Sequence, residues 1–253
     1  EAIENILEAA NYKKDGKCKA LIVTGCLAER YRDDIKAELP EVDVTVSLAG
    51  NNDIVDIVKN AFKGICDDGY GKKEDLIIEG ERLLTTPSYT AYVKIAEGCD
   101  NCCTYCAIPK IRGRFRSRKI EDVVSEVERL VKQGVKEVIL VAQDTTRYGK
   151  DIYGTPQLST LLKKVCKIDG LYWVRTLYTY PDLITDDLLD TIASEKKIVN
   201  YLDIPLQHCD GAVLKRMNRK GDRESLEALM EKIRAKIPDI TLRTTLITGF
   251  PGE

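Results

Sequence analysis

The sequence contains a single histidine, no large excess of positive or negative charge and no long apolar segment. His208 is the only histidine among 253 residues, which excludes chemistry that needs a pair of histidines within this chain. Lys and Arg total 39 and Asp and Glu total 41, so the charge balance gives no global signature of nucleic-acid binding. No apolar run reaches the roughly 18 residues that a membrane-spanning helix needs. We therefore expect no membrane association, and only local contacts with any polyanion.

Cysteine, by contrast, is plentiful. Nine cysteines occur without a signal-peptide pattern, which indicates a reducing compartment and a cytoplasmic location. Glu1 is not a start methionine, and residues 2–10 already follow a helical pattern with one apolar face. We interpret the sequence as a fragment, and we expect more chain after Glu253.

The most informative stretch has the spacing Cys-x3-Cys-x2-Cys, at Cys99, Cys103 and Cys106. Thiolates this close in sequence can bind three irons of a 4Fe-4S cluster and leave the fourth iron open to another ligand. An alternating strand at 91–95, followed by Glu97-Gly98, leads into this loop. Functional loops follow the strand ends in a parallel α/β barrel. The spacing therefore predicts a redox cluster with an open iron at the mouth of a barrel.

A fourth cysteine, Cys102, allows a second interpretation. The pairs Cys99/Cys102 and Cys103/Cys106 also resemble a four-thiolate zinc site. Such sites normally place a loop of roughly 12–20 residues between the two pairs so that the sulfurs converge on one ion. Here the pairs are adjacent and the neighbouring side chains diverge, which favours the cluster over zinc or a disulfide.

The order of strands and helices predicts an α/β protein in two parts. Residues 1–66 fit a small N-terminal α/β domain with a parallel sheet, in the order helix, strand, helix, strand, helix. Its strands are expected at 20–23 and at the alternating residues Val42, Val44 and Val46. Residues 67–88 fit a connector with a short strand at 76–78.

Residues 89–253 fit a partial (β/α) barrel of the TIM-barrel type. Apolar spacing supports each element, for example Val123, Val127 and Leu130 on one helical face. The expected strands lie at 91–95, 135–142, 173–178, 199–204 and 240–247, and the expected helices at 120–133, 157–167, 185–195 and 222–236.

Short sequence motifs at the ends of the predicted strands resemble those of a known family. The cysteine loop, with an aromatic residue just before its last cysteine, resembles that of radical S-adenosylmethionine (SAM) enzymes. Gln-Asp-Thr-Thr-Arg-Tyr-Gly at 143–149, Tyr-Leu-Asp-Ile-Pro-Leu-Gln-His at 201–208 and Thr-Gly-Phe-Pro-Gly-Glu at 248–253 extend the resemblance over essentially the whole chain. Together they resemble the methylthiotransferases of that superfamily. The first two stretches resemble the branch that modifies a ribosomal protein rather than the branch that modifies transfer RNA.

The resemblance implies a reaction and its cofactors. In this family one 4Fe-4S cluster binds SAM at its open iron and cleaves it to a 5'-deoxyadenosyl radical, and an auxiliary 4Fe-4S cluster in the N-terminal domain carries sulfur. Two SAM molecules are consumed to place a methylthio group on the β-carbon of an aspartate in ribosomal small-subunit protein twelve. The implied partners are that protein and an electron donor such as flavodoxin or ferredoxin, without a membrane and without nucleic acid as the direct substrate.

The resemblance also assigns candidate residues. Cys99, Cys103 and Cys106 are the implied ligands of the SAM-binding cluster, and Cys26 is one implied ligand of the auxiliary cluster. Cys18 precedes Cys26 by roughly 26 Å of extended chain at about 3.3 Å per residue, so we expect the other two ligands upstream of Glu1 and no complete auxiliary site in this fragment. The residues implied to contact SAM are Tyr105, Gln143, Asp144, Arg175, Thr245 and Gly249, and Gln207 and His208 are candidates for contact with SAM or substrate.

Three questions stay open at this level. The transfer-RNA branch of the family is the nearest alternative function, and a non-catalytic zinc or iron-sulfur binding module is the alternative from a different class. Residues 110–119 carry six positive charges, which fit either a solvated face or a grip on an acidic partner. Both branches share parts of this basic run, so it does not separate RNA from protein as the substrate.

Overall fold

The computed structural model describes residues 1–72 and 82–253. The expected strand at 76–78 lies outside the described residues. The chain forms two compact units: an N-terminal unit of Glu1–Ile77 with Ala107–Gly113, and a C-terminal unit of Ile78–Cys106 with Arg114–Glu253. Each unit is described by itself. The domain boundaries expected from the sequence stay a prediction.

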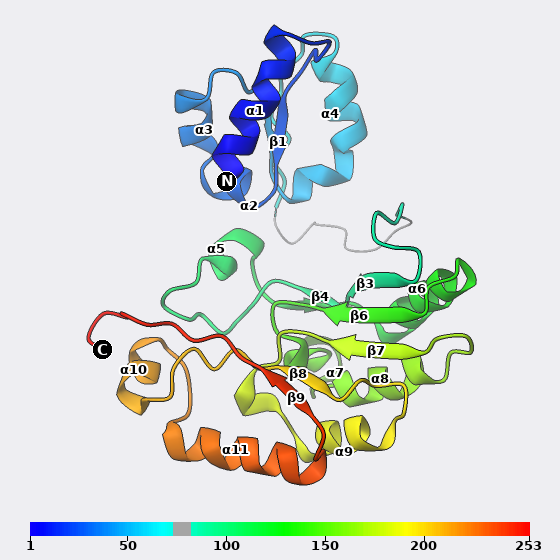
Figure 1. The fold of residues 1–253 in the computed structure, drawn as a ribbon. Helices are drawn as coiled ribbons and strands as arrows, with labels where there is room; N and C mark the ends of the chain where they lie inside the picture. Colours follow the sequence, from blue (N-terminus) through cyan, green and yellow to red (C-terminus); the bar gives the residue numbers. More distant parts are fainter. Residues whose placement is uncertain (73–81) are drawn as a thin grey trace. The chain divides into compact units, whose positions relative to one another are not determined.

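The N-terminal unit contains a two-stranded parallel sheet with helices around it (Figure 1). Ile22 pairs with Val44 and Thr24 with Val46, which confirms the predicted parallel pairing. Buried Ile6 from the first helix packs with Val23 and Ala28. The elements are α1 (Ala2–Lys14), β1 (Ile22–Thr24), α2 (Cys26–Arg30), α3 (Arg32–Glu38), β2 (Val44–Val46), the 3-10 helix η1 (Ala49–Asp53), α4 (Ile54–Ala61) and α5 (Ile108–Arg112).

The strand β2 contains Val44 and Val46 of the expected strand but not Val42. Val44, Thr45 and Val46 are all buried. Side chains cover both faces of this short parallel strand, so its polar residue is buried as well. Val55 on α4 is 63% exposed, and Phe62, the residue after the helix, is 62% exposed.

Asp68 ties the chain after α4 back to β2 and α3. Its carboxylate accepts hydrogen bonds from the N–H (3.3 Å) and the hydroxyl (3.1 Å) of Thr45 and from Arg32 Nη2 (3.1 Å), and it forms an ion pair with Lys36. Burial by itself raises the pKa of Asp68, but the hydrogen bonds from Lys36, Arg32 and Thr45 outweigh burial and hold the pKa below its ordinary value.

We expect Asp68→Asn to destabilise the N-terminal unit by about 1–3 kcal/mol near neutral pH, because it removes the mostly buried carboxylate that pairs with Arg32 and Lys36 and accepts from buried Thr45. A lowered pKa in the folded state adds stability above the pKa of the unfolded carboxyl, and this stability is lost as the pH falls through the folded value. Urea denaturation at neutral and at acidic pH measures the difference, which should vanish in acid. Asp67→Asn, at an exposed neighbour, is the matched control. Equal midpoints for the two variants at neutral pH would contradict this role.

Parallel strands form the centre of the C-terminal unit (Figure 1). The strands β3 (Thr90–Lys94), β6 (Glu137–Val141) and β7 (Trp173–Thr176) pair in that order, and β8 (Tyr201–Asp203) pairs with β9 (Thr241–Arg243). Backbone hydrogen bonds join Val174 to Lys197 and Val199 and so connect the two sheets. The predicted α/β class with parallel sheets is therefore confirmed.

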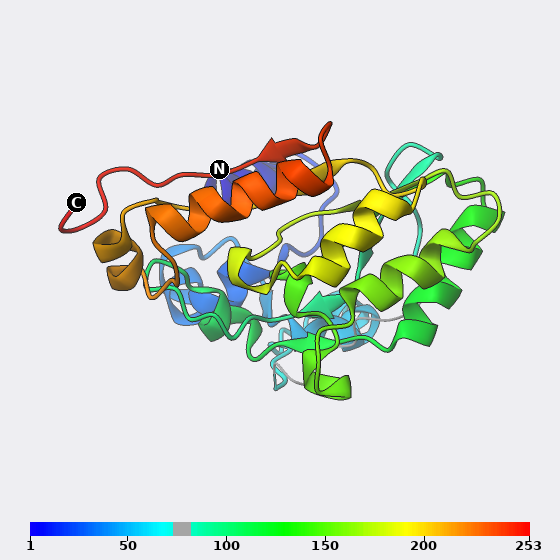
Figure 2. The same ribbon diagram turned by 90° about the horizontal axis from the view of Figure 1, so that it is seen from below.

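Helices cover one face of these strands. Figure 2 shows these helices side by side, coloured from green to orange. Ala91 and Val93 on β3 are completely buried against this layer, whereas Tyr92 between them is 45% exposed on the opposite face. The core-forming helices are α6 (Ile120–Lys132), α8 (Leu158–Cys166), α9 (Asp186–Ser194) and α11 (Arg223–Lys236).

The sequence did not predict the short elements of the C-terminal unit. Most of them follow the strands, where they shape the loops. The last strand was expected to run to Ile247 but ends at Arg243, and one isolated bridge between Gln207 and Leu246 follows it. The missed elements are the antiparallel pair β4 (Ala96–Glu97) and β5 (Arg116–Ser117), the helices α7 (Lys150–Tyr153) and α10 (Gly211–Arg216), and the 3-10 helices η3 (Thr145–Arg147) and η4 (Pro181–Leu183).

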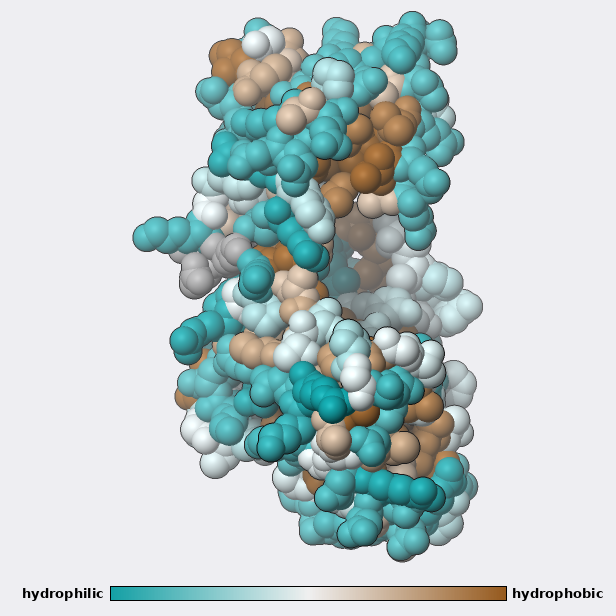
Figure 3. Space-filling model, turned by 90° about the vertical axis from the view of Figure 1, so that its left-hand side faces the viewer, coloured by the Kyte–Doolittle hydropathy of each residue, from teal (hydrophilic) through white to brown (hydrophobic). Residues whose placement is uncertain are grey.

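Hydrophobic side chains also reach the surface of the N-terminal unit. The space-filling view shows brown atoms gathered on one side of it (Figure 3). On α1, Ile6 and Ala10 of the predicted apolar face are buried, but Ile3 and Leu7 are 52% and 43% exposed. Among the described residues, no helix combines the length and the apolar character that a membrane crossing requires.

Candidate metal centre

The cysteine loop begins where β3 and β4 end. Lys94 closes β3, and the carboxylate of Glu97 is completely buried and pairs with Lys94 Nζ at 2.7 Å. Gly98 follows with φ 78°, in the left-handed region that favours glycine, and turns the chain into the loop. Asp100, the second residue of the loop, is held in place because its Oδ1 accepts a hydrogen bond from the Phe115 N–H at 3.2 Å.

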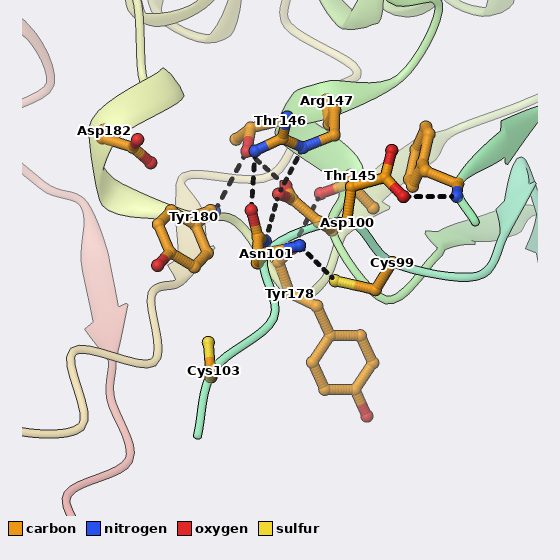
Figure 4. Close-up of polar contacts among 12 residues, drawn as sticks. Cys99, Asp100, Asn101, Cys103, Thr145, Thr146, Arg147, Tyr178, Tyr180 and Asp182 are labelled. Carbon is orange, nitrogen blue, oxygen red and sulfur yellow. Dashed lines mark hydrogen bonds and ion pairs between the residues drawn. The ribbon is translucent and has the colours of Figure 1, made fainter. Parts of the chain in front are cut away.

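The segment after β6 holds the loop through Asn101 (Figure 4). Asp144, 1% exposed, accepts a hydrogen bond from Asn101 Nδ2 at 2.9 Å and one from the hydroxyl of Thr146 at 2.5 Å. Arg147 Nη2 donates to Asn101 Oδ1 at 2.6 Å, and Arg147 Nε lies 3.5 Å from Asp144 Oδ2. The Asn101 side chain is thus fixed at both its amide atoms, and its backbone N–H points at Cys99 Sγ at 3.5 Å.

The segment that follows α10 holds the other half of the loop. Asn218, in the left-handed conformation with φ 56°, donates to the carbonyl of Cys102 at 3.0 Å and reaches that of Asn101 at 3.4 Å. Thr104 donates its N–H to Met217 O and its hydroxyl to Arg216 O, both at 3.1 Å. The loop is therefore held from two segments that lie far apart in the sequence, one after β6 and one at the end of α10.

The cysteines differ in their surroundings. Cys99 is buried, and burial raises the pKa of its thiol to about 11, while the Asn101 N–H acts in the opposite direction. Cys103 Sγ accepts a contact from Arg219 Nη1 at 3.8 Å. Cys103 and Cys106 are half-buried, whereas Cys102 is exposed and has φ 50°.

Two tyrosines lie near Cys103. Burial raises the pKa of both Tyr105 and Tyr180, and in each case Arg219 lowers the pKa and Cys103 raises it. The Arg219 guanidinium lies over the Tyr180 ring at 4.2 Å from its centroid. A pocket of about 330 Å³ opens beside these groups, lined by Asp100, Asn101, Arg147, Tyr180, Asp182, Lys215, Asn218, Arg219 and Lys220.

The donor set of the loop suits an iron-sulfur cluster. Within residues 1–72 and 82–253, no three Cys, His, Asp or Glu side chains converge closely enough to hold one metal ion. A cluster spreads its thiolates over separate irons. Three thiols on one loop, with N–H donors aimed at two of the sulfurs, match that donor chemistry.

Gln143, one of the candidate SAM contacts, has a side-chain oxygen that is available as a hydrogen-bond acceptor. Gln143 Oε1 is buried, and it finds no hydrogen-bond partner in the described part of the chain. A buried carbonyl oxygen of this kind suits a ligand amino group or a bound water. The oxygens of Asp144, by contrast, are turned to the loop. Arg175 stands on the strand face opposite the helices, where Nε donates to Glu137 Oε1 at 3.1 Å and the guanidinium lies 5.0 Å from the Tyr201 ring centroid.

The remaining candidates lie after β8 and β9. Gln207 has φ 72°, and its N–H donates to the carbonyl of exposed Thr245 at 2.8 Å. His208 Nδ1 accepts the Asp210 N–H at 2.9 Å. This tautomer leaves the proton on Nε2, which lies 3.5 Å from Glu253 Oε1. Gly249 has φ 73° and nothing near its Cα that would block a side chain.

Cys26 lies in the N-terminal unit at the first position of α2, after Gly25 with φ 101°. Its Sγ accepts a hydrogen bond from Arg112 Nη2 on α5 at 3.3 Å. Cys18 instead donates to the nearby carbonyl of Ala20 at 3.3 Å.

The sequence analysis did not identify Asn218, Arg219 and Asp203 as candidate functional residues. The first two follow α10, and their partners in the cysteine loop are more than a hundred residues away, so no local pattern signals the contact. Asp203 is 1% exposed, and one of its oxygens binds Arg243 Nη1 at 3.0 Å while the other, Oδ1, finds no partner in the described chain. The sequence did contain one indication for Asp203, because this charged residue lies within the strand predicted at 199–204.

A family model described as the radical SAM superfamily matches residues 93–253. Curated relatives include "Ribosomal protein uS12 methylthiotransferase RimO" of Clostridium botulinum (strain Hall), 50% identical over 254 residues, and the same-named protein of Desulforamulus reducens, 50% identical over 257 residues. Each alignment covers 100% of this chain and 57% of the relative, so the chain spans somewhat more than half the length of these relatives.

Solved structures support the fold alone. The radical S-adenosylmethionine methyltransferase TsrM from Kitasatospora setae is 13% identical, with a TM-score of 0.63 over 99% of this chain and 60% of its own. The cobalamin-dependent S-adenosylmethionine radical enzyme OxsB is 12% identical, with a TM-score of 0.63 over 97% of this chain and 38% of its own.

Proposed function

Because the chain belongs to the radical SAM superfamily, we propose that it is part of a methylthiotransferase that modifies ribosomal protein uS12. One observation carries this proposal. The chain is 50% identical over its whole length to proteins named uS12 methylthiotransferase, and its three-cysteine loop follows a parallel strand and is hydrogen-bonded to the segments that follow β6 and α10.

In this proposal Cys99, Cys103 and Cys106 hold a 4Fe-4S cluster that supplies an electron to SAM. Tyr105, Gln143, Arg175, Thr245 and Gly249 surround the bound SAM. The unpartnered side-chain oxygen of Gln143 supports its proposed contact with SAM, because an amino group of the ligand would complete the hydrogen bonding of this oxygen. Asp144 acts indirectly, by fixing Asn101 and with it the loop.

The finer chemistry rests on the same proposal. The acceptor is the β-carbon of an aspartate in uS12, two SAM molecules are consumed, and a flavodoxin or ferredoxin supplies the electron. Gln207 and His208 contact SAM or the substrate. Cys26 is one ligand of an auxiliary cluster that carries the sulfur, and the hydrogen bond from Arg112 to its sulfur is compatible with a thiolate ligand. The site of action is the cytoplasm.

The test is modification of uS12 in cells. The protein, extended to the full length of its relatives, is expressed in bacteria whose own uS12 and transfer-RNA methylthiotransferases have been deleted, and peptides of uS12 are weighed by mass spectrometry. We expect one methylthio group in place of one hydrogen on a single aspartate. Its absence from uS12, together with methylthiolated adenosine in transfer RNA, would assign the chain to the transfer-RNA branch instead.

A further inference from the structure

Arg219 is a buried cation without a buried anion. Its residue exposure is 8%, and no ion pair joins it to a carboxylate in the described part of the chain. Taking a guanidinium out of water is costly unless an opposite charge compensates it. Arg219 contacts a carbonyl, an aromatic ring and a thiol, and it also forms a side-chain hydrogen bond with Tyr105.

Two of these contacts fix the guanidinium independently of the thiol. Nη2 donates to Pro205 O at 2.7 Å, and the plane of the group lies over the Tyr180 ring, 4.2 Å from its centroid. Stacking and a directed hydrogen bond suit the flat guanidinium better than an ammonium group. Held in this way, Nη1 is presented to Cys103 Sγ at 3.8 Å.

We infer that Arg219 is the counter-charge of the iron-sulfur cluster at Cys99, Cys103 and Cys106, and that it makes this cluster easier to reduce. The inference rests on the proposed function, since it needs a cluster on this loop. A cluster held by three thiolates is anionic, and one-electron reduction makes it more so. A fixed positive charge beside one sulfur in a poorly solvated site stabilises the reduced form over the oxidised form. Arg219 is a positioning residue that acts through the cluster.

The neighbouring cation Lys220 does not share this role. Lys220 is the next residue and lines the same pocket, but its side chain is 82% exposed and pairs with Asp182 at 3.4 Å. Water and salt screen an exposed ammonium group. Lys220→Met therefore removes the same formal charge one residue away and serves as the matched control.

The experiment is a redox titration with dithionite of the anaerobically reconstituted chain, followed by electron paramagnetic resonance, with iron and sulfide content measured on each sample. We expect Arg219→Gln and Arg219→Met to disfavour reduction at least tenfold, a fall in midpoint potential of about 59 mV for a one-electron couple. Arg219→Lys should shift the midpoint less than Arg219→Gln, and Lys220→Met should leave it at the wild-type value.

The outcomes separate this inference from the proposed function. A wild-type chain that takes up no cluster would sink the proposed function. Full clusters with unchanged potentials in Arg219→Gln and Arg219→Met would sink the role of Arg219 alone, as would Arg219→Lys behaving like Arg219→Gln. If the Gln and Met variants fail to retain a cluster, retention by Arg219→Lys supports the counter-charge, and loss in all three variants reduces Arg219 to a structural residue.

Discussion

Cys103→Ser should abolish binding of the cluster, whereas Cys102→Ser should leave it intact. The two residues are neighbours, so the pair tests which parsing of the cysteine loop is correct. Cys103 is half-buried with Arg219 directed at its sulfur, and Cys102 is exposed with its carbonyl bound by Asn218. Serine is a poor substitute for a thiolate ligand of iron, because the soft sulfur donor is lost.

Iron and sulfide content after anaerobic reconstitution, together with formation of 5'-deoxyadenosine from SAM, measures both variants. Cys102→Ser should match the wild type in both, and Cys103→Ser should fall to background. A four-thiolate site predicts a different result, in which both variants lose the metal equally. That result would restore the zinc interpretation with its ligand pairs Cys99/Cys102 and Cys103/Cys106.

Asp144→Ala should weaken cluster binding by about 10–100-fold although no atom of Asp144 is proposed to touch iron. The substitution leaves the Asn101 amide and Arg147 without their shared acceptor in a buried place. Asn101 then loses the contact that aims its N–H at Cys99. Breaking a buried charged pair from one side costs more than removing an exposed pair.

Iron affinity, measured by competition with a chelator, separates this effect from general unfolding, which circular dichroism reports. Asp182→Ala is the matched control, because Asp182 lines the same pocket but pairs with exposed Lys220. We expect nearly unchanged affinity for that control. An Asp144→Ala variant that binds iron as tightly as the wild type would show that the loop does not depend on this network.

The parallel α/β architecture could be predicted from the sequence, because the spacing of apolar residues within each helix and strand and the order of these elements are visible in local stretches of the chain. It placed Asp144 at the end of a strand, and the structure puts that residue beside the loop. It could not reveal that Asn218 and Arg219 brace the same loop, since contacts between residues more than a hundred positions apart depend on the tertiary fold.

The basic run at 110–119 shows another limit. A run of positive charges is usually a solvated face. Arg118 nevertheless is 3% exposed and donates to Glu126 Oε2 at 2.5 Å and to Lys94 O at 2.8 Å. Its partner lies on α6, eight residues further along, and the turn from β5 into that helix is needed to bring the two together. Charge counting alone does not distinguish such a residue from its exposed neighbours.

The most direct test of the account is the electron paramagnetic resonance spectrum of the reduced, reconstituted wild-type chain with and without SAM. An open iron binds SAM, so the account predicts a 4Fe-4S signal whose shape changes when SAM is added, in a sample that contains about four irons on the Cys99–Cys106 loop. A colourless protein that holds zinc, or a cluster signal that SAM leaves unchanged, would contradict it.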